Sequence, residues 1–181
     1  MQASPKTNPQ AMLHVYDLDG EEYSIPTENT HDVFRKYTVS AAEIAICKRL
    51  FAHPLPNVVR VYDVNEAEKY IDLEYLDVDM VAPKEDKLHD FANGIAQLHE
   101  HQVVYIDVKE DNIGYSRQDH RWKVFDFDRC GVVDPHNTRR WHIHPRYSYT
   151  YQKFRSVPIR ASFYEYDEHI LAYCKNNINY F

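Results

Sequence analysis

Two short apolar runs in the middle of the chain carry carboxylates, which restricts the folds that the chain can adopt. Residues 103–108 are rich in β-branched side chains and include Asp107, and residues 122–127 contain Asp126. Polar residues separate the two runs, with Gly114 at an expected turn. Two strands joined by a turn bring their ends together. The pattern therefore predicts a hairpin that places both carboxylates in one site.

Three kinds of polar side chain occupy the loop that contains Asp107. Lys109 follows it at the second position and Asn112 at the fifth. Phosphoryl transfer needs a carboxylate to orient the attacking hydroxyl, a cation for the phosphate charge and oxygen ligands for magnesium. The loop supplies all three, and Asp126 adds a carboxylate for the metal. For Asp107 or Asp126 alone a turn-capping role is the better interpretation, but not for the four residues together.

The first part of the chain predicts a small β-rich unit around one helix. The turn signal Asp19-Gly20 stands between two alternating segments, which favours a hairpin. Ser40 is placed to cap a helix with an apolar stripe, and Pro54 and Pro56 end that helix. The expected strands cover residues 12–16, 22–25, 33–37, 58–64 and 70–76.

The second part of the chain predicts a helical unit. From Lys84 onward, apolar residues recur every three or four positions on one helical face. Residues 131–160 show no clear periodicity, and residues 164–173 predict a last helix. The arginines of the stretch without periodicity lie among aromatic residues, which suits a phosphate or an acidic partner, although a solvated surface is the preferred interpretation. The apolar face comprises Leu88, Phe91, Ile95 and Leu98.

Composition narrows the class of protein. Of 181 residues, 44% are hydrophobic and 27% are charged, and the net charge of −7 argues against a broad nucleic-acid surface. Three widely spaced cysteines predict neither a disulfide framework nor a CxxC metal site. No apolar run approaches the ~20 residues that cross a bilayer, and the polar start lacks a secretory signal. We expect a flexible tail, residues 1–11, and one domain over residues 12–181, in an intracellular protein without a membrane partner.

Two motifs in the middle of the chain carry a family resemblance. Residues 105–112 read YIDVKEDN, and residues 126–128 read DFD. They resemble the HRDxKxxN catalytic loop and the DFG metal-binding motif of the protein kinase-like superfamily. The resemblance covers residues 33–131 well. It implies a minimal α+β fold with two lobes, a small β-rich N-lobe over residues 12–76 and a truncated helical C-lobe over residues 77–181.

The resemblance also implies a role for each polar residue of the predicted site. Asp107 would act as the catalytic base, and Lys109 would steady the γ-phosphate of ATP. Asn112 and Asp126 would share Mg²⁺.

Upstream segments extend the resemblance to the nucleotide. Residues 53–64 resemble the HPNIVRLYDV pattern that follows the regulatory helix in many kinases. Glu43 is then the candidate helix glutamate, and Lys36 its partner on the α- and β-phosphates of ATP. Arg35 is an alternative phosphate contact, and an exposed strand cation beside a helix-start acid is the alternative for the pair. Residues 72–79 resemble the hinge between the lobes. The candidates that would face adenine there are Glu74 and Leu76.

Departures from the superfamily pattern leave three functions open. The chain has only four glycines and no glycine-rich phosphate loop, Tyr105-Ile106 replaces His-Arg, and Asp128 replaces the glycine of DFG. The first hypothesis is an ATP- and Mg²⁺-dependent kinase acting on Ser or Thr of a protein substrate. The second is a pseudokinase that binds a partner protein. The third is a small-molecule kinase of the aminoglycoside or choline phosphotransferase type, to which Asp134-Pro135 after FDFD points. A truncated C-lobe would also leave an apolar face open to oligomer formation.

Overall fold

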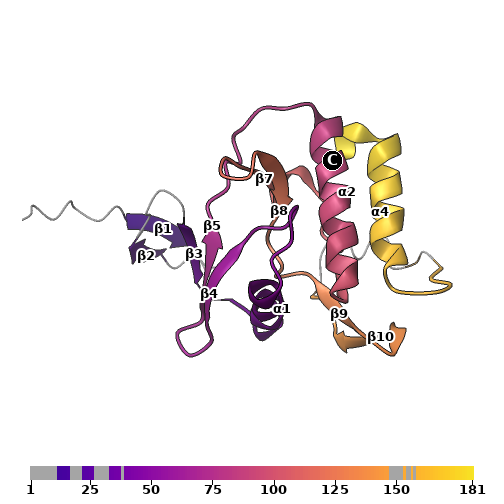
Figure 1. Ribbon diagram of the computed structural model, residues 1–181, viewed down its shortest axis with the longest axis horizontal. Helices are drawn as coiled ribbons and strands as arrows, with labels where there is room; N and C mark the ends of the chain where they lie inside the picture. The colour runs from indigo at the N-terminus through magenta and orange to yellow at the C-terminus, as the bar shows by residue number, and fades with distance from the viewer. Residues whose placement is uncertain are drawn as a thin grey trace, which may run out of the picture.

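A computed structural model shows the chain in two parts (Figure 1). Strands of the N-terminal part lie on the left of the view, and two upright helices of the C-terminal part lie on the right. Side chains are described from Val33 onward. The tail predicted at residues 1–11 and the turn signal Asp19-Gly20 lie outside the described residues. The described residues are 12–16, 22–26, 33–37, 39–146, 153, 156 and 158–181.

The N-terminal part contains two antiparallel sheets. Strands β1 (Met12–Tyr16) and β2 (Glu22–Pro26) form a hairpin, as the alternating pattern predicts. Strands β3 (Val33–Tyr37), β4 (Val61–Asn65) and β5 (Tyr70–Glu74) form a second sheet in the order β3-β5-β4. The five expected strands are therefore present, but they divide between two sheets.

The chain before β4 takes a different course from the strand expected at residues 58–64. Val58 forms a single parallel bridge with Val124, and Val59 N donates to Val124 O at 2.8 Å. The strand begins only at Val61, where pairing with β5 takes over. The first residues of the expected strand therefore pair with the second half of the chain and fasten the two parts together.

Helix α1 (Ala41–Ala52) begins where the sequence predicts. The hydroxyl oxygen of Ser40 accepts a hydrogen bond from Glu43 N at 3.1 Å, which satisfies one of the free amides of the first turn. The helix ends at Ala52, and its C-cap residue His53 stands directly before Pro54, which cannot continue the helix. A charged residue, Glu43, lies on the buried face. The buried residues of α1 are Glu43, Ile44, Ile46, Cys47 and Leu50.

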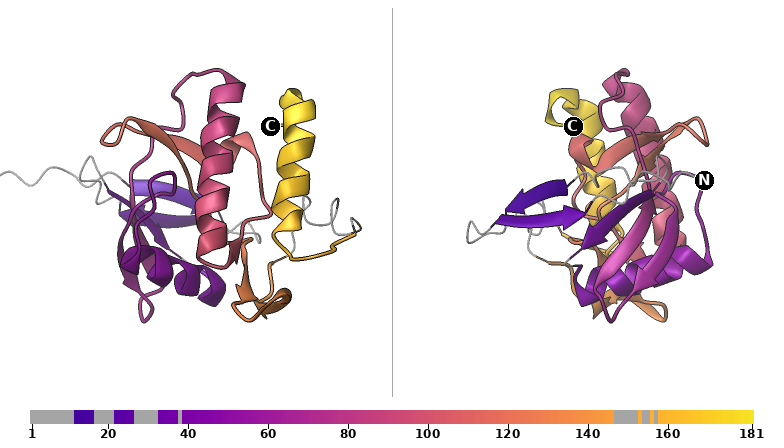
Figure 2. Two further views of the ribbon diagram at one scale, coloured as in Figure 1. Left: turned by 45° about the vertical axis from the view of Figure 1, so that its right-hand side comes forward. Right: turned by 90° about the vertical axis from the view of Figure 1, so that its left-hand side faces the viewer.

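Helices α2 (Lys84–Glu100) and α4 (Glu165–Asn176) lie side by side in the C-terminal part (Figures 1 and 2). The predicted apolar face of α2 is buried because its residues recur at helical spacing. Strands β7 (Ile113–Ser116) and β8 (Arg121–Val124) form a hairpin against α2, preceded by the short helical turn η1 (Glu110–Asn112). No helix in the described part of the chain is long and apolar enough to cross a membrane.

The β7–β8 hairpin leads to the predicted site, but its first strand is β7 and not the expected run at residues 103–108. The two apolar runs do not pair with each other, and the first run supplies β6 (Val103–Val104), which pairs with β9 (Gly131–Asp134). Gly114 lies inside β7 rather than at a turn. A Cβ atom on it would lie 2.6 Å from Leu76 Cβ. The prediction of a turn at Gly114 was therefore wrong. The close approach of Leu76, and not a special backbone conformation, is the reason why a glycine stands at this position.

Strand β10 (Asn137–Ile143) pairs with β9 in an antiparallel hairpin that the sequence pattern did not predict. The register shifts twice, between Asn137 and Trp141 and between Trp141 and Ile143. Such shifts break the regular alternation of side chains on which a strand prediction depends. The sheet has the order β10-β9-β6, so it leads directly into the segment before Asp107.

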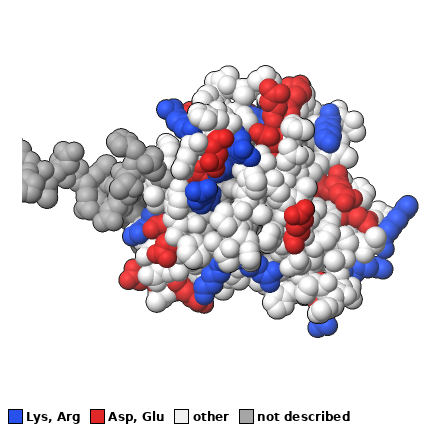
Figure 3. Space-filling model, in the orientation of Figure 1, with Lys and Arg blue, Asp and Glu red and all other residues white. Residues whose placement is uncertain are grey.

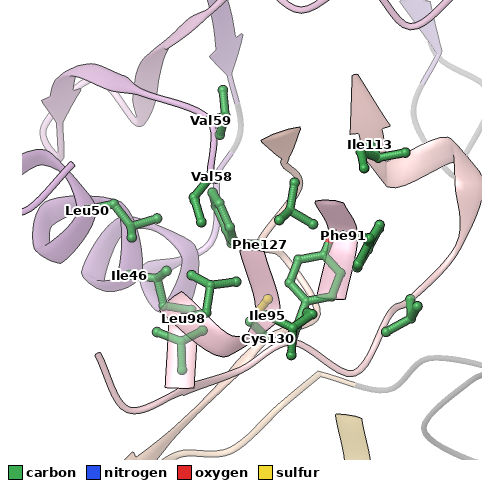
Figure 4. Packing of buried hydrophobic residues seen from close by; sticks show 14 of the residues in the cluster. Ile46, Leu50, Val58, Val59, Phe91, Ile95, Leu98, Ile113, Phe127 and Cys130 are labelled. Atoms are coloured by element: carbon green, nitrogen blue, oxygen red, sulfur yellow. The ribbon is translucent and has the colours of Figure 1, made fainter. Parts of the chain in front are cut away.

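One hydrophobic core joins the two parts (Figure 4). Side chains from α1, from α2 and from the segment after β8 meet in it, and all three cysteines belong to it. Burial raises the pKa of each thiol, so none is a ready nucleophile at neutral pH. The free cysteines are Cys47, Cys130 and Cys174.

Candidate active site

Lys36 joins residues that are far apart in the sequence. Its Nζ atom lies 2.7 Å from Glu43 Oε1 and 2.7 Å from Asp126 Oδ1. Strand β3 carries Lys36, the first turn of α1 carries Glu43, and Asp126 follows β8. The side chain of Glu43 is only 2% exposed, whereas that of Asp126 is 31% exposed. The structure therefore brings three of the predicted site residues into one charged group.

Alternation along β3 turns Arg35 away from this group. Its Nε and Nη2 atoms lie 2.6 and 2.7 Å from the two carboxylate oxygens of Asp72, and its guanidinium stands 4.0 Å from the ring centroid of Tyr70. Successive side chains of a strand point to opposite faces of the sheet, so Arg35 and Lys36 cannot both face α1. Lys36, and not Arg35, stands beside Asp126.

The surrounding charges keep Lys36 protonated. Burial opposes its positive charge, but the carboxylates of Glu43 and Asp126 outweigh that effect and raise the pKa of the ammonium. Burial also raises the pKa of the Glu43 carboxyl, and Lys36 opposes this rise. Lys36 is therefore a cation throughout the neutral pH range, as a contact for phosphate must be.

The loop residues Asp107, Lys109 and Asn112 form a second polar group. Lys109 Nζ lies 3.2 Å from Asp107 Oδ2. The amide Nδ2 of Asn112 donates to the backbone oxygen of Asp107 at 2.9 Å and to its Oδ2 at 3.3 Å. Asp107 and Asn112 are 8% and 3% exposed. Because Nδ2 is used to hold Asp107, the amide oxygen is the atom of Asn112 that can serve a ligand.

Backbone contacts hold the two polar groups next to each other. Phe125 N donates to Asn112 O at 3.1 Å, and the hydroxyl of Tyr105 donates to Phe125 O. Among the described residues, no hydrogen bond or ion pair joins the side chain of Asp126 directly to that of Asp107 or Asn112. The sharing of a metal ion by Asn112 and Asp126 therefore stays a prediction.

Asp167 supports the loop from α4, a role that the sequence pattern did not indicate. Its Oδ1 accepts from Ile106 N at 2.6 Å and its Oδ2 from Tyr105 N at 2.8 Å. His99 Nε2 lies 2.8 Å from the same Oδ2. Ile106 has a φ of 70°, a left-handed conformation that is costly for a β-branched residue. Asp167 therefore holds the backbone directly before Asp107 in a strained shape.

A cavity of about 360 Å³ lies beside Lys36 and Asp126, which are part of its lining. Its volume falls within the ~300–1,000 Å³ range of small-molecule sites. The rest of the lining is mainly apolar, and a flat base joined to phosphates requires such a combination of apolar wall and adjacent charge. The apolar side chains of the lining include Val59, Leu73, Leu76, Val78 and Phe125.

Glu74 also lines this cavity, but its carboxylate is directed elsewhere. Oε2 lies 2.7 Å from Lys123 Nζ, and Oε1 accepts from the hydroxyl of Ser116. The side chains of Glu74 and Lys123 are 4% and 2% exposed. The side chain of Glu74 is therefore not available to adenine, and only its backbone could face the base. Leu76 contributes its side chain to the apolar lining.

We expect Lys123→Met to lower the free energy of unfolding by about 3 kcal/mol, because it leaves the Glu74 carboxylate buried without its cation. Urea denaturation followed by tryptophan fluorescence measures the change. The double variant Glu74→Leu/Lys123→Met removes both buried charges and should recover most of the loss, because Asp119, the second partner of Lys123, is partly exposed and can be solvated. A single variant as stable as the double variant would contradict this account of the pair.

Glu110 ties the loop to helix α2. Its Oε1 lies 2.8 Å from Lys87 Nζ, and its Oε2 lies 3.0 Å from Lys84 Nζ. Hydrogen bonds from Lys87 and Lys84 lower the pKa of the Glu110 carboxyl below its ordinary value of 4.5. A lowered pKa in the folded state adds stability above the ordinary pKa, and that stability is lost as the pH falls through the lowered value.

Glu110→Gln should therefore be less stable than the parent chain above pH 4.5, and the difference should disappear in stronger acid. Thermal unfolding from neutral to strongly acidic pH measures it. The control is Glu100→Gln, an exposed residue at the end of α2 that forms no ion pair among the described residues. A difference between Glu110→Gln and the parent that does not vary with pH would rule out the ion pair as its cause.

The family model of the protein kinase domain matches residues 18–152, which include both polar groups and the cavity. The chain belongs to the protein kinase family. Its mixed α+β fold with a small β-rich N-lobe confirms the predicted fold class. A solved structure of the RNA Pol II CTD kinase CTDK-1 complex from yeast is similar, with 18% sequence identity and a TM-score of 0.44. The similarity covers 77% of this chain and 53% of that chain, so this kinase domain spans about half of the length of that one.

Proposed function

We propose that the chain is an ATP- and Mg²⁺-dependent protein kinase that phosphorylates Ser or Thr. The proposal is carried by the contact of Lys36 with both Glu43 and Asp126 beside an apolar cavity. A cation held by a buried acid suits nucleotide phosphates, and the cavity suits adenine. In this proposal Lys36 contacts the α- and β-phosphates, and Glu43 positions Lys36.

The loop supplies the groups for phosphate transfer. Asp107 orients the acceptor hydroxyl and receives its proton as the hydroxyl oxygen attacks the γ-phosphorus and the bond to ADP breaks. Lys109, at 3.2 Å from Asp107, neutralises charge on the γ-phosphate. Asn112 holds the Asp107 carboxylate through its amide nitrogen, so the base keeps one orientation.

Asn112 and Asp126 are the residues that would hold Mg²⁺. Their carboxylate and amide oxygens match the preference of this hard cation, which usually keeps waters and substrate phosphates as its other ligands. Asp126 contacts Lys36 through Oδ1, and among the described residues its Oδ2 forms no hydrogen bond or ion pair, so it keeps an oxygen for a metal. When bound, the ion neutralises charge on the phosphates.

A pseudokinase that binds a partner protein is the second candidate, and the missing glycine-rich loop favours it. Gly20 is the only glycine among the first 93 residues, so no glycine-rich segment is available to cover the phosphates of a nucleotide. Asp128 also replaces the glycine of the DFG motif, after Phe127.

A kinase for small molecules, the third hypothesis, would differ from the first in its product. Analysis of the phosphorylated acceptor identifies that product.

Thermal unfolding with ATP, in the presence and absence of Mg²⁺, tests the proposal, because a ligand that binds only the folded state raises the melting temperature. We expect ATP with Mg²⁺ to raise it by about 5 °C. Asp126→Asn should remove the part of the rise that depends on Mg²⁺, whereas Asp111→Asn, at an exposed position of the same loop, should not. No rise at millimolar ATP would instead favour the pseudokinase.

A further inference from the structure

Positive charge is concentrated in one segment of an otherwise acidic chain. Residues 129–160 contain seven Lys and Arg and a single Asp, a net charge of +6. The remaining residues contain 14 Lys and Arg against 27 Asp and Glu. In Figure 3, basic side chains project at the lower right, the region of β10 in Figure 1, and acidic side chains gather above them. Two arginines of this segment are already paired, since Arg129 and Arg146 both contact Asp128. A local excess of positive charge in an acidic protein attracts an anionic partner to that region.

Strand β10 and the segment beside it present this charge to solvent. Arg139 and Arg140 are exposed on β10, and Arg160 is exposed on the segment that precedes α4. Phe163 N donates to Thr138 O at 2.9 Å, which places that segment along the strand. In the described part of the chain, none of these three arginines forms an ion pair. We call Arg139, Arg140 and Arg160 the basic strip.

Aromatic packing anchors the strand that carries the strip. Trp141 stacks on Phe163 with ring centroids 4.3 Å apart and an angle of 20° between the planes. It also lies nearly parallel to Tyr166, at 6.4 Å. Because neighbouring side chains of a strand point to opposite faces, the inward position of Trp141 directs Arg140 and His142 outward. The guanidinium group of Arg140 is therefore held at the surface, and Arg139 is also exposed because the register shifts between Asn137 and Trp141.

The strip is connected to the predicted phosphotransfer loop through one sheet. Strand β10 pairs with β9, and β9 pairs with β6. Strand β6 ends at Val104, three residues before Asp107, and β9 begins at Gly131, five residues after Asp126. Strand β10 is the outermost strand of this sheet, and Arg139 and Arg140 are exposed on it. A peptide bound there is attached to the same framework as the loop.

We propose that the basic strip binds acidic residues of the protein substrate and so holds its Ser or Thr near Asp107. The inference rests on the proposed kinase function. Arginine suits this role because its planar guanidinium binds a carboxylate through two parallel hydrogen bonds. An acidic protein segment fits the strip better than a nucleic acid, because a long polyanion would extend beyond the strip over a surface of its own charge.

Direct binding of labelled peptides tests the proposal. Three fluorescent peptides of equal length carry one Ser flanked by a run of Glu, of Gln or of Lys, and fluorescence anisotropy gives their dissociation constants. The Glu peptide should bind the parent chain about tenfold more tightly than the Gln peptide, and the Lys peptide should bind least. Equal affinities for the Glu and Gln peptides would overturn the proposal.

Charge-removing variants locate the binding. Arg139→Gln/Arg140→Gln should weaken binding of the Glu peptide about tenfold, the effect of losing two exposed charge pairs. The control is Arg117→Gln/Arg121→Gln, which removes two exposed arginines from the β7–β8 hairpin, one of them paired with Asp77, and should leave the affinity unchanged. Equal losses in both double variants would show a general charge effect and overturn the strip as the site.

Two further measurements separate the possible failures. The peptide assay needs no ATP, so a chain that binds the Glu peptide but shows no thermal shift with ATP would lack the proposed kinase function and still have the strip as a docking site. A shift of the melting temperature with ATP but no preference for the Glu peptide would support the kinase function and overturn the strip as a docking site. Tighter binding of an oligouridine RNA than of the Glu peptide would also overturn the proposal. If the double variant does not fold, the peptide comparison on the parent chain still decides.

Discussion

Asp107→Asn should lower the rate of phosphate transfer by about 1,000-fold and leave the dissociation constant of ATP within about twofold of the parent value. The amide cannot receive the proton of the acceptor hydroxyl, but it keeps an oxygen at the position that contacts Asn112 and Lys109. Asp107 is not among the described residues that line the cavity, so the base of ATP retains its contacts. Incorporation of the γ-phosphate into an acceptor protein measures the rate, and calorimetric titration measures the affinity.

The control for this prediction is Asp111→Asn, which makes the same change of charge at an exposed position of the same loop. Its rate and its affinity for ATP should both match the parent values. Full activity of Asp107→Asn would contradict the role of Asp107 as the catalytic base. A large loss of ATP affinity in Asp107→Asn would instead indicate that this carboxylate holds the nucleotide, directly or through its metal.

Asp167→Ala should lower the free energy of unfolding by about 4 kcal/mol, because it leaves buried backbone amides without their charged acceptor. Asp167 is fully buried and accepts from the amides of Tyr105 and Ile106. The positive φ of Ile106 adds to the effect, since nothing then offsets the cost of that conformation. Urea denaturation measures the loss, and the rate of phosphate transfer should fall with it as the loop relaxes.

Glu168→Ala is the matched control, because it removes the neighbouring acid at an exposed position of α4. It should change the free energy of unfolding by no more than about 0.5 kcal/mol. Asp167→Asn keeps one acceptor oxygen and should fall between Asp167→Ala and the parent, which preserves the test if the alanine variant is too unstable to purify. A loss below about 1 kcal/mol in Asp167→Ala would exclude the supporting role.

The composition of the candidate site could be predicted from the sequence because most of it is local. Asp107, Lys109 and Asn112 lie within six positions, and a chain segment of that length keeps its side chains within reach of one another. The hydrogen bonds and the ion pair among them follow from this closeness. Glu43 is similarly local, because Ser40 fixes the start of the helix and so the direction of its first turn.

The fold was predictable where a pattern repeats regularly, and less so where it is interrupted. Helix α2 follows from apolar residues at helical spacing, which any buried amphipathic helix needs. The hairpin of β9 and β10 was missed because its register shifts disturb the alternation. A turn was wrongly predicted at Gly114 because the sequence does not distinguish a glycine required by a close neighbour from a glycine required by a turn.

The sequence by itself determined which chemical groups are available and where regular helices and strands form, since both depend on residues a few positions apart. Only the tertiary structure decided which distant partners these groups contact. Lys36 contacts Asp126 across 90 positions, Asp167 contacts Ile106 across 61, and the Glu74 carboxylate turns to Lys123 across 49. A buried charge requires a partner, but several partners of the right sign exist in the sequence. Which partner is contacted depends on how the whole chain packs around the core, so no local sequence pattern predicts it.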